Sequence, residues 1–227
     1  MTAFERFLET FFKAELIAAT APKIVSGMGM TLLIAGLVVA TGVALGLLLA
    51  GLRSYRIAPV SAPIVIFADI LRAMPPLVLI LIVYFGLPNV GVTLSGFAVL
   101  WLVLSLVLAA FAEEIFWAGI TSIRKGQWDA ARATGLSYTA TLIWVILPQA
   151  VRLTVPPLVN RTIAITKNTA LGTVIGVPEI LNQATTAVSF SGNATPLMMG
   201  AVAYLVIFIP VVMIGRMIER RLAWKRA

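Results

Sequence analysis

The chain has 227 residues, of which 60% are hydrophobic and only 11% are charged, whereas soluble domains carry about 25% charged residues. Such a chain cannot cover itself with polar surface, so its composition excludes a soluble protein and predicts one integral membrane unit. The absence of cysteine and histidine excludes disulfides, thiol nucleophiles and the commonest metal ligand, and we expect no metal or cofactor. The net charge of +8 would suggest nucleic acid in a soluble protein. Here we expect no nucleic acid, because the placement of the charges indicates membrane orientation.

Residues 1–23 alternate charged residues, such as Glu5, Arg6 and Glu9, with Phe and Leu. This segment shows no short apolar stretch with a small-residue cleavage site, so we expect no signal peptide. The pattern predicts an N-terminal amphipathic helix that lies on the membrane surface. An ordinary solvated helix is the alternative.

Five stretches are apolar over the roughly 20 residues that a spanning helix needs. They lie at residues 24–52, 58–86, 95–123, 138–165 and 196–218. Pro75 and Pro76 interrupt the second stretch. Pro148 and residues 156–157 are expected to bend the fourth, because each proline frees a carbonyl one turn earlier. The sequence therefore predicts an all-α integral membrane protein with five transmembrane helices, whose spanning domain covers residues 24–221.

Three smaller features complete this outline. In the first stretch, the spacing Gly42-x-x-x-Gly46 allows a neighbouring helix to approach closely. Residues 171–191, between the fourth and fifth stretches, are amphiphilic and predict a short helix or a re-entrant segment on the outer side. The chain is expected to end in a basic cytoplasmic tail, residues 222–227.

Positive residues gather at three places, which alternate with connections that carry almost no charge. They are Arg53, Arg56, Arg124, Lys125, Arg132, Arg216, Arg220, Arg221, Lys225 and Arg226. Residues 87–94 have no charge, and residues 168–195 have only Glu179. Because loops rich in Lys and Arg stay in the cytoplasm, we predict an outer N-terminus, an inner C-terminus and a cytoplasmic connection between the third and fourth stretches.

That connection, about residues 124–137, is polar and rich in residues with small side chains. Residues 127–134 are expected to form a short helix, with Asp129 in its first turn, where a carboxylate complements the helix dipole. Gly135 is placed to end this helix, and Ser137 to cap the next one. Ala130 and Ala131 leave a surface that another protein can approach closely. The alternative is a simple turn between two spans.

The motif Asp129-Ala130-Ala131, followed by Gly135 and by a stretch that ends in Leu147-Pro148, resembles the "EAA" loop of ABC importer permeases. Further segments in the same order are similar to the polar amino-acid branch of that family, and the resemblance extends from about residue 27 to about residue 221. These further segments are Gly126-Gln127, Leu147-Pro148-Gln149-Ala150, Pro156-Pro157-Leu158-Val159-Asn160 and Lys167-Asn168-Thr169-Ala170-Leu171.

The resemblance implies a type I importer permease fold in a bacterial cytoplasmic (inner) membrane. It implies a separate cytoplasmic ATPase that grips the connection, a second permease subunit in a homodimer or heterodimer, and an extracytoplasmic solute-binding protein. The coupling residues it implies are Gln127, Asp129, Ala130, Ala131, Gly135, Leu147 and Pro148.

Placing an ionisable group within a spanning helix costs free energy unless the group is paired or hydrated, so each such residue is a functional candidate. Asp69 and Arg72 are three residues apart and share a helix face, which lets them neutralise each other. The carboxylates Glu113 and Glu114 would suit the ammonium group of a zwitterionic solute, and the cations Arg161 and Lys167 would suit its carboxylate. Pairing across helices, which would hold the bundle together, is the alternative.

Three segments resemble the family's motifs, and the last of them lies along its translocation path. They begin at Leu71, Glu114 and Asn160. The substrate-pathway residues that this implies are Arg72, Glu114, Asn160, Lys167 and Thr169. The chain departs from the family pattern at Ala73, Met74, Trp117, Asn168 and Ala170, which lie along the expected path rather than in the coupling loop.

We therefore predict a permease subunit that moves a polar amino acid or a similar small solute. The chain has no phosphate-binding loop of the G-x-x-x-x-G-K-[ST] type, so ATP hydrolysis is expected on a partner and the chain itself is expected not to be an enzyme. The alternative functions are an ion-gradient-driven transporter subunit and a non-transporting membrane scaffold.

Overall fold

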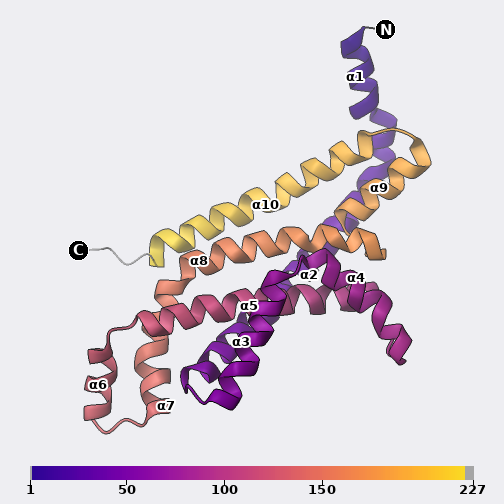
Figure 1. Ribbon diagram of the computed structural model, residues 1–227. Coiled ribbons are helices and arrows are strands. Elements are labelled where there is room, and N and C mark those ends of the chain that lie inside the picture. Colours follow the sequence, from indigo (N-terminus) through magenta and orange to yellow (C-terminus); the bar gives the residue numbers. More distant parts are fainter. Residues whose placement is uncertain (1, 223–227) are drawn as a thin grey trace. The chain divides into compact units, whose positions relative to one another are not determined.

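The computed structural model describes residues 2–222 of the chain, and the side chains of residues 2–220. Every element in that part of the chain is a helix (Figure 1). The α-helices are α1 (Ala3–Phe11), α2 (Ala14–Ser54), α3 (Ala58–Ala73), α4 (Pro76–Gly86), α5 (Gly96–Ser122), α6 (Lys125–Ala133), α7 (Tyr138–Thr141), α8 (Leu147–Lys167), α9 (Ile180–Ser191) and α10 (Thr195–Leu222). Short turns of 3₁₀-helix form η1 (Leu87–Val90) and η3 (Asn168–Ile175), and a π-helical turn forms η2 (Leu142–Ile146). Residues 223–227 of the expected basic tail lie outside the described residues.

Within the described residues, four helical stretches are long and apolar enough to cross a membrane by themselves. A fifth span results when α3 and α4 are counted as one broken helix. The predicted all-α class with five spanning stretches is therefore confirmed. The amphiphilic segment after the fourth stretch contains a short helix, α9, as expected.

The second apolar stretch breaks at its prolines. Met74, which follows α3, adopts an extended backbone conformation with φ −94° and ψ 138°. The reason is that a residue before a proline is disfavoured in the helical region. Helix α4 then restarts at Pro76, since a proline in the first turn removes only an N–H group that the helix would leave unpaired.

The fourth stretch accommodates Pro148 by a local change of helix type. The N–H of Leu147 donates to the carbonyl of Leu142, five residues earlier, and this wider π turn precedes the proline. The side-chain amide of Gln149 donates to the carbonyl of Val145 at 2.7 Å. Helix α8, which starts at Leu147, thus accommodates Pro148 directly after a wider turn and continues through Pro156 and Pro157.

The N-terminal segment differs from the single helix expected over residues 1–23. Helix α1 ends at Phe11, where Phe12 leaves the helical conformation, and α2 starts at Ala14. Helix α2 contains Pro22 in its interior, so no helix boundary lies at residue 23. The apolar run that follows carries the helix through the proline, and sequence reasoning placed the start of this helix ten residues too late.

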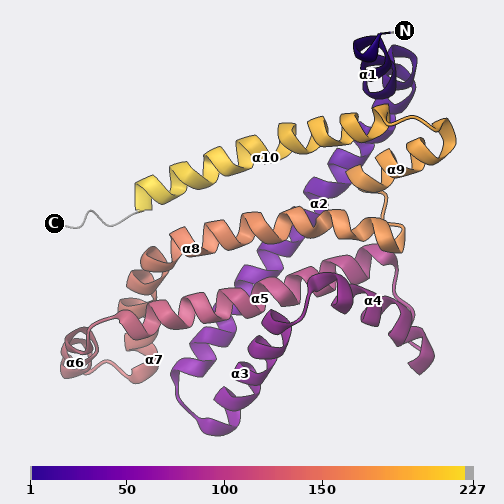
Figure 2. The same cartoon turned by 45° about the horizontal axis from the view of Figure 1, so that its top comes forward.

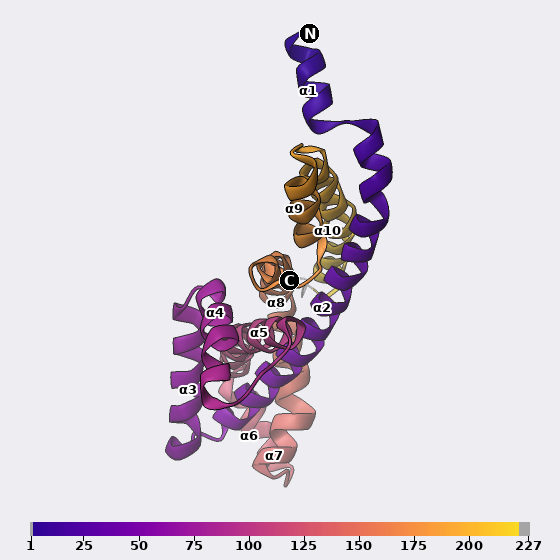
Figure 3. The ribbon, with the colours of Figure 1, turned by 90° about the vertical axis from the view of Figure 1, so that its right-hand side faces the viewer.

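The chain forms two compact units, and the first comprises the residues up to Leu37 together with Leu77–Val103 and Thr166–Val212. Its core joins α2, α9 and α10 through buried residues (Figure 3). Those residues are Ile24, Ile180, Ala184, Ala203, Ile207 and Phe208. A Cβ atom on Gly27 would lie 3.0 Å from the backbone of Ile180, so the absence of a side chain lets α9 lie directly on α2.

The start of α9 in this unit is fixed by a fully buried carboxylate, that of Glu179. One carboxylate oxygen accepts from the hydroxyl of Thr173 at 2.5 Å, and the other accepts from the hydroxyl of Tyr204 at 2.6 Å. The N–H groups of Leu181 and Asn182 donate to the same carboxylate. Four donors and the positive end of the helix offset the cost of burying this charge.

The second unit comprises Val38–Pro76, Leu104–Ile165 and the residues from Met213. Figure 2 shows α6 and α7 following α5 as a short helical hairpin in this unit. The close approach predicted from Gly42 and Gly46 is made to α5. A Cβ on Gly42 would lie 2.8 Å from the Cβ of Leu108, and one on Gly46 would lie 2.5 Å from the Cβ of Ala112.

Gly46→Ala is therefore expected to destabilise the second unit by about 1–3 kcal/mol, because the added methyl group overpacks a rigid contact. Its Cβ would also lie 2.9 Å from the carbonyl oxygen of Ala109, and backbone cannot move aside. The measurement is thermal unfolding of the purified chain in detergent. Gly51→Ala is the matched control, since nothing lies within 4 Å of its Cβ position. Equal melting of the two variants would contradict the predicted contact.

Candidate functional site

Helix α6 is the predicted short helix between the third and fourth apolar stretches, with shifted bounds. It ends where expected, because Gly135 adopts a left-handed conformation with φ +89° and Ser137 caps α7 by accepting from the N–H of Ala140. It begins at Lys125, since the N–H of Gln127 already bonds to the carbonyl of Arg124 at 2.9 Å. The prediction that Asp129 lies in the first turn is therefore wrong: this carboxylate lies in the second turn.

Of the predicted coupling residues in and directly after α6, four are exposed and one is buried. Gln127, Asp129, Ala130 and Gly135 are exposed, and Ala131 is buried at 8% exposure. The exposed surface of α6 thus combines the small residues Gly126, Ala130 and Ala133 with longer polar side chains, and it has no exposed large apolar side chain. It lies open for close approach by another surface.

Leu147 and Pro148 lie apart from this face, at the start of α8. Leu147 packs against a buried cluster of α2, α5 and the fourth span, and Trp128 of α6 packs against the same cluster. Pro148 is exposed. The two helices are also joined directly, because the amide of Gln149 donates to the side-chain oxygen of Gln127 at 3.3 Å.

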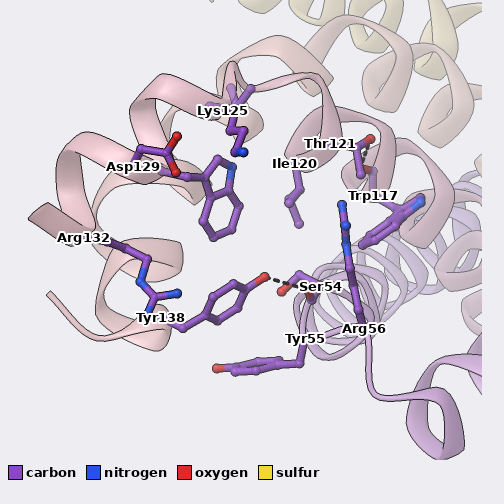
Figure 4. A pocket seen from close by; sticks show the side chains of 12 residues that line it. Ser54, Tyr55, Arg56, Trp117, Ile120, Thr121, Lys125, Asp129, Arg132 and Tyr138 are labelled. Carbon is purple, nitrogen blue, oxygen red and sulfur yellow. Dashed lines mark hydrogen bonds between the residues drawn. The ribbon is translucent and has the colours of Figure 1, made fainter.

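Aromatic residues attach α6 to the end of α2, and Figure 4 shows the part of this attachment between Tyr138 and Ser54. The ring of Trp128 stacks on that of Tyr138, with 5.1 Å between the centroids. The hydroxyl of Tyr138 donates to the carbonyl of Ser54 at 2.6 Å, and the hydroxyl of Tyr55 bonds to that of Thr139 at 2.9 Å. Stacked rings and two hydrogen bonds therefore connect α6, through α7, to the end of the spanning helix α2. Sequence reasoning missed this attachment, although aromatic residues near span ends were a signal for it.

A second group of functional candidates forms a charge cluster around Arg53, which we define as Arg53, Asp69, Arg72, Glu113 and Glu114. Arg53 donates to both oxygens of Glu113, at 2.9 and 3.2 Å, and lies 3.5 Å from Glu114. Arg72 bonds to Asp69 at 2.6 Å and lies 3.4 Å from Glu114. The predicted pairing of Asp69 with Arg72 is confirmed.

The charge cluster contains a buried part and an exposed part. The side chain of Glu113 has no exposed surface and that of Arg53 is only 16% exposed, while the side chains of Glu114 and Asp69 are 42% and 61% exposed. The ring of Trp117 lies 4.5 Å from the guanidinium of Arg53 and covers it. Three carboxylates against two cations leave the cluster acidic, and its excess negative charge is on the exposed side.

The other predicted pathway residues lie outside the charge cluster. Asn160 donates to the carbonyl of Pro156 and to the carboxylate of Glu219, both at 3.2 Å. Lys167, in the first unit, is exposed at the end of α8. Thr169 in that unit is fully buried and donates to the carbonyl of Thr166 at 2.9 Å. In this conformation Thr169 stabilises a turn and offers no surface to a solute.

Comparisons with known proteins agree with this architecture. Residues 42–224 match the model of the binding-protein-dependent transport system inner membrane component family, so the chain belongs to that family of transport proteins. The probable amino-acid ABC transporter permease protein YckA of Bacillus subtilis is 36% identical over 176 residues, which are 78% of each chain. The arginine transport system permease protein ArtQ of the same organism is 34% identical over 203 residues, which cover 88% of this chain and 93% of the relative.

A solved structure described as an amino acid ABC transporter with histidines has the same fold. It superposes with a TM-score of 0.82 at 30% sequence identity, over 90% of this chain and 96% of that one. The methionine ABC transporter MetNI, at 21% identity and a TM-score of 0.68, shares the fold alone. The fold is thus that of an ABC importer permease, a multi-pass inner-membrane component.

Proposed function

We propose that this chain is the permease subunit of an importer for a polar amino acid or a similar small solute, driven by a separate ATPase that grips α6. The observation that carries the proposal is the attachment of α6. Its exposed surface carries no large apolar side chain, and Trp128 and Tyr138 attach the helix to the end of α2. A partner that moves α6 therefore moves a spanning helix.

The ATPase is a separate chain in this proposal, because the sequence has no phosphate-binding loop. Five spanning helices are too few to enclose a solute path, so a second permease subunit completes the pore in this proposal. A solute-binding protein on the outer side delivers the solute. ATP binding closes the ATPase pair, carries the α6 helices with it, and rocks the spans between inward-open and outward-open states. The side that carries α6 is the cytoplasmic side in this mechanism.

The solute class follows from the charge cluster and from the relatives. In the second unit, the exposed carboxylates of Glu114 and Asp69 suit an ammonium group. In the first unit, taken by itself, the exposed cation of Lys167 suits a carboxylate. Relatives that cover most of this chain carry names of amino-acid permeases. A polar amino acid presents both of these groups.

The test is uptake by proteoliposomes that contain this permease with its ATPase and binding protein. We expect accumulation of a labelled amino acid only with ATP inside, on the side of the ATPase. Uptake that follows a proton or sodium gradient without the ATPase would instead assign the chain to ion-driven transport.

Lys167→Ala is expected to lower uptake roughly 10- to 100-fold at limiting solute, because a hydrogen bond to a charged group contributes about 1.5–3 kcal/mol. Lys167→Arg keeps the charge and should retain most uptake. Arg152→Ala removes another exposed cation of α8 and is the matched control. The measurement is the initial uptake rate together with co-purification of the ATPase. Undiminished uptake by Lys167→Ala would contradict a role of this residue in solute binding and leave it with a structural role.

A further inference from the structure

A cavity of ≈ 500 Å³ lies under α6, against the ends of α2 and α5. Figure 4 shows its lining, in which the cations Arg56, Lys125 and Arg132 accompany a single carboxylate, Asp129. Among the residues whose side chains the structure describes, none of these three cations has a carboxylate within the 4.0 Å of an ion pair. The cavity therefore has an unneutralised positive charge and suits an anion.

The backbone at Arg56 is an independent sign of a built site. Its φ of +57° is the only left-handed value at a non-glycine position among the described residues. Asn, Asp and Gly occupy this region far more easily than arginine does. A strained residue beside a cavity points to a function for its side chain, and Arg56 and Trp117 both line this cavity (Figure 4).

An apolar groove of ≈ 430 Å³ shares one wall with this cavity, because Tyr55 lines both. Its other lining residues come from α2, the π turn and the start of α8, and none carries a polar side chain. Leu48, Leu52 and Ile143 are 58%, 42% and 45% exposed, so the groove is open at its side. It runs along α2 from Ala44 to Leu52, about 12 Å at the helical rise of about 1.5 Å per residue.

We propose that the cavity and the groove together bind one anionic phospholipid, with the phosphate head group among the three cations and an acyl chain along the groove. The cavity lies where α2 and α5 end and where tyrosine and tryptophan side chains gather, which is the level of the head groups in a bilayer. Basic pockets between spanning helices are suited to anionic head groups. A soluble anion or an acidic side chain of a partner protein would fill the cavity and leave the groove empty.

Such a lipid would lie between α6 and the end of α2 and would brace the attachment described above. The inference thus goes beyond solute transport and makes the coupling element sensitive to the lipid composition of the membrane. It concerns the permease chain alone, and its test needs no ATPase.

The test uses the purified full chain in detergent, with phosphatidylglycerol and phosphatidylcholine of identical acyl chains in equal amounts. Native mass spectrometry counts the lipid that stays bound. We expect one phosphatidylglycerol bound in preference to phosphatidylcholine, and a preference that falls as salt is raised. Arg56→Gln and Arg132→Gln should each reduce the preference roughly fivefold. Glutamine keeps the Cβ atom and so leaves the backbone strain at Arg56 unchanged.

Two further variants separate the possible outcomes. Arg152→Gln removes an exposed cation outside the cavity and should leave the preference unchanged. Ala44→Phe fills the groove and should weaken lipid binding while the chain melts as the wild type does. An equal preference in the wild type and in the Arg56→Gln/Arg132→Gln double variant overturns the proposal. Displacement of the lipid by inorganic phosphate, with no effect of Ala44→Phe, assigns the cavity to a soluble anion and also overturns it.

Discussion

Arg53→Ala is expected to destabilise the second unit by about 3–5 kcal/mol, since removing one partner of a buried ion pair leaves the other charge uncompensated. The carboxylate left behind is that of Glu113, which has no exposed surface and receives two hydrogen bonds from Arg53. Arg53 also neutralises part of Glu114. The measurement is the thermal transition of the purified chain in detergent, together with the amount of chain that inserts into the membrane.

Two companion variants show whether the lost pair is the cause. Arg53→Lys keeps the charge but not the paired geometry of the guanidinium, so its effect should be intermediate. Arg53→Met combined with Glu113→Leu removes both charges and should recover most of the stability. A double variant as unstable as Arg53→Ala, or an Arg53→Ala chain as stable as the wild type, would contradict the assignment of a buried ion pair.

Gly135→Asp is expected to reduce co-purification of the ATPase at least about tenfold, while the chain still inserts and folds. Among the residues that the structure describes, nothing lies within 4 Å of a Cβ at this exposed position, so the new side chain meets no neighbour there. It extends instead from the end of α6 toward the surface that we propose the ATPase grips. A new charge buried at a well-packed contact costs more than the 1.4 kcal/mol that a tenfold loss represents.

The control for this variant is Gly192→Asp. Gly192 also has a left-handed backbone, with φ +63°, and open space around its Cβ position, but it follows α9 in the first unit. Both substitutions place a side chain at a positive φ with open space around it, and they differ in place. Equal loss of ATPase binding in both variants would mean that strain, and not a docking contact at α6, is responsible.

Features that depend on neighbouring residues were predictable from the sequence. Apolar length identified the spans, Gly135 and Ser137 marked the boundary between α6 and α7, and the spacing of Asp69 and Arg72 predicted their ion pair. Each of these features is decided within a few residues by backbone conformation or by helix periodicity. The sequence pattern was therefore sufficient for them.

Features that depend on distant parts of the chain were not predictable in this way. Arg53 and Glu113 are 60 residues apart, and no periodicity shows that they meet. Arg53 was interpreted only as a charge that sets orientation. The burial of Thr169 likewise follows from the path of the folded chain. The attachment of Trp128 to Tyr138 needed the fold for the same reason.

The most direct test of the account uses a single cysteine at Thr134, the exposed residue that follows α6. The chain has no other cysteine, so a membrane-impermeant maleimide reports this position alone. We predict no labelling in intact cells, rapid labelling in inverted membrane vesicles stripped of the ATPase, and protection when the ATPase is added back. Labelling of Thr134→Cys from outside intact cells would place α6 on the wrong side of the membrane and contradict the claim that an ATPase drives this permease through α6.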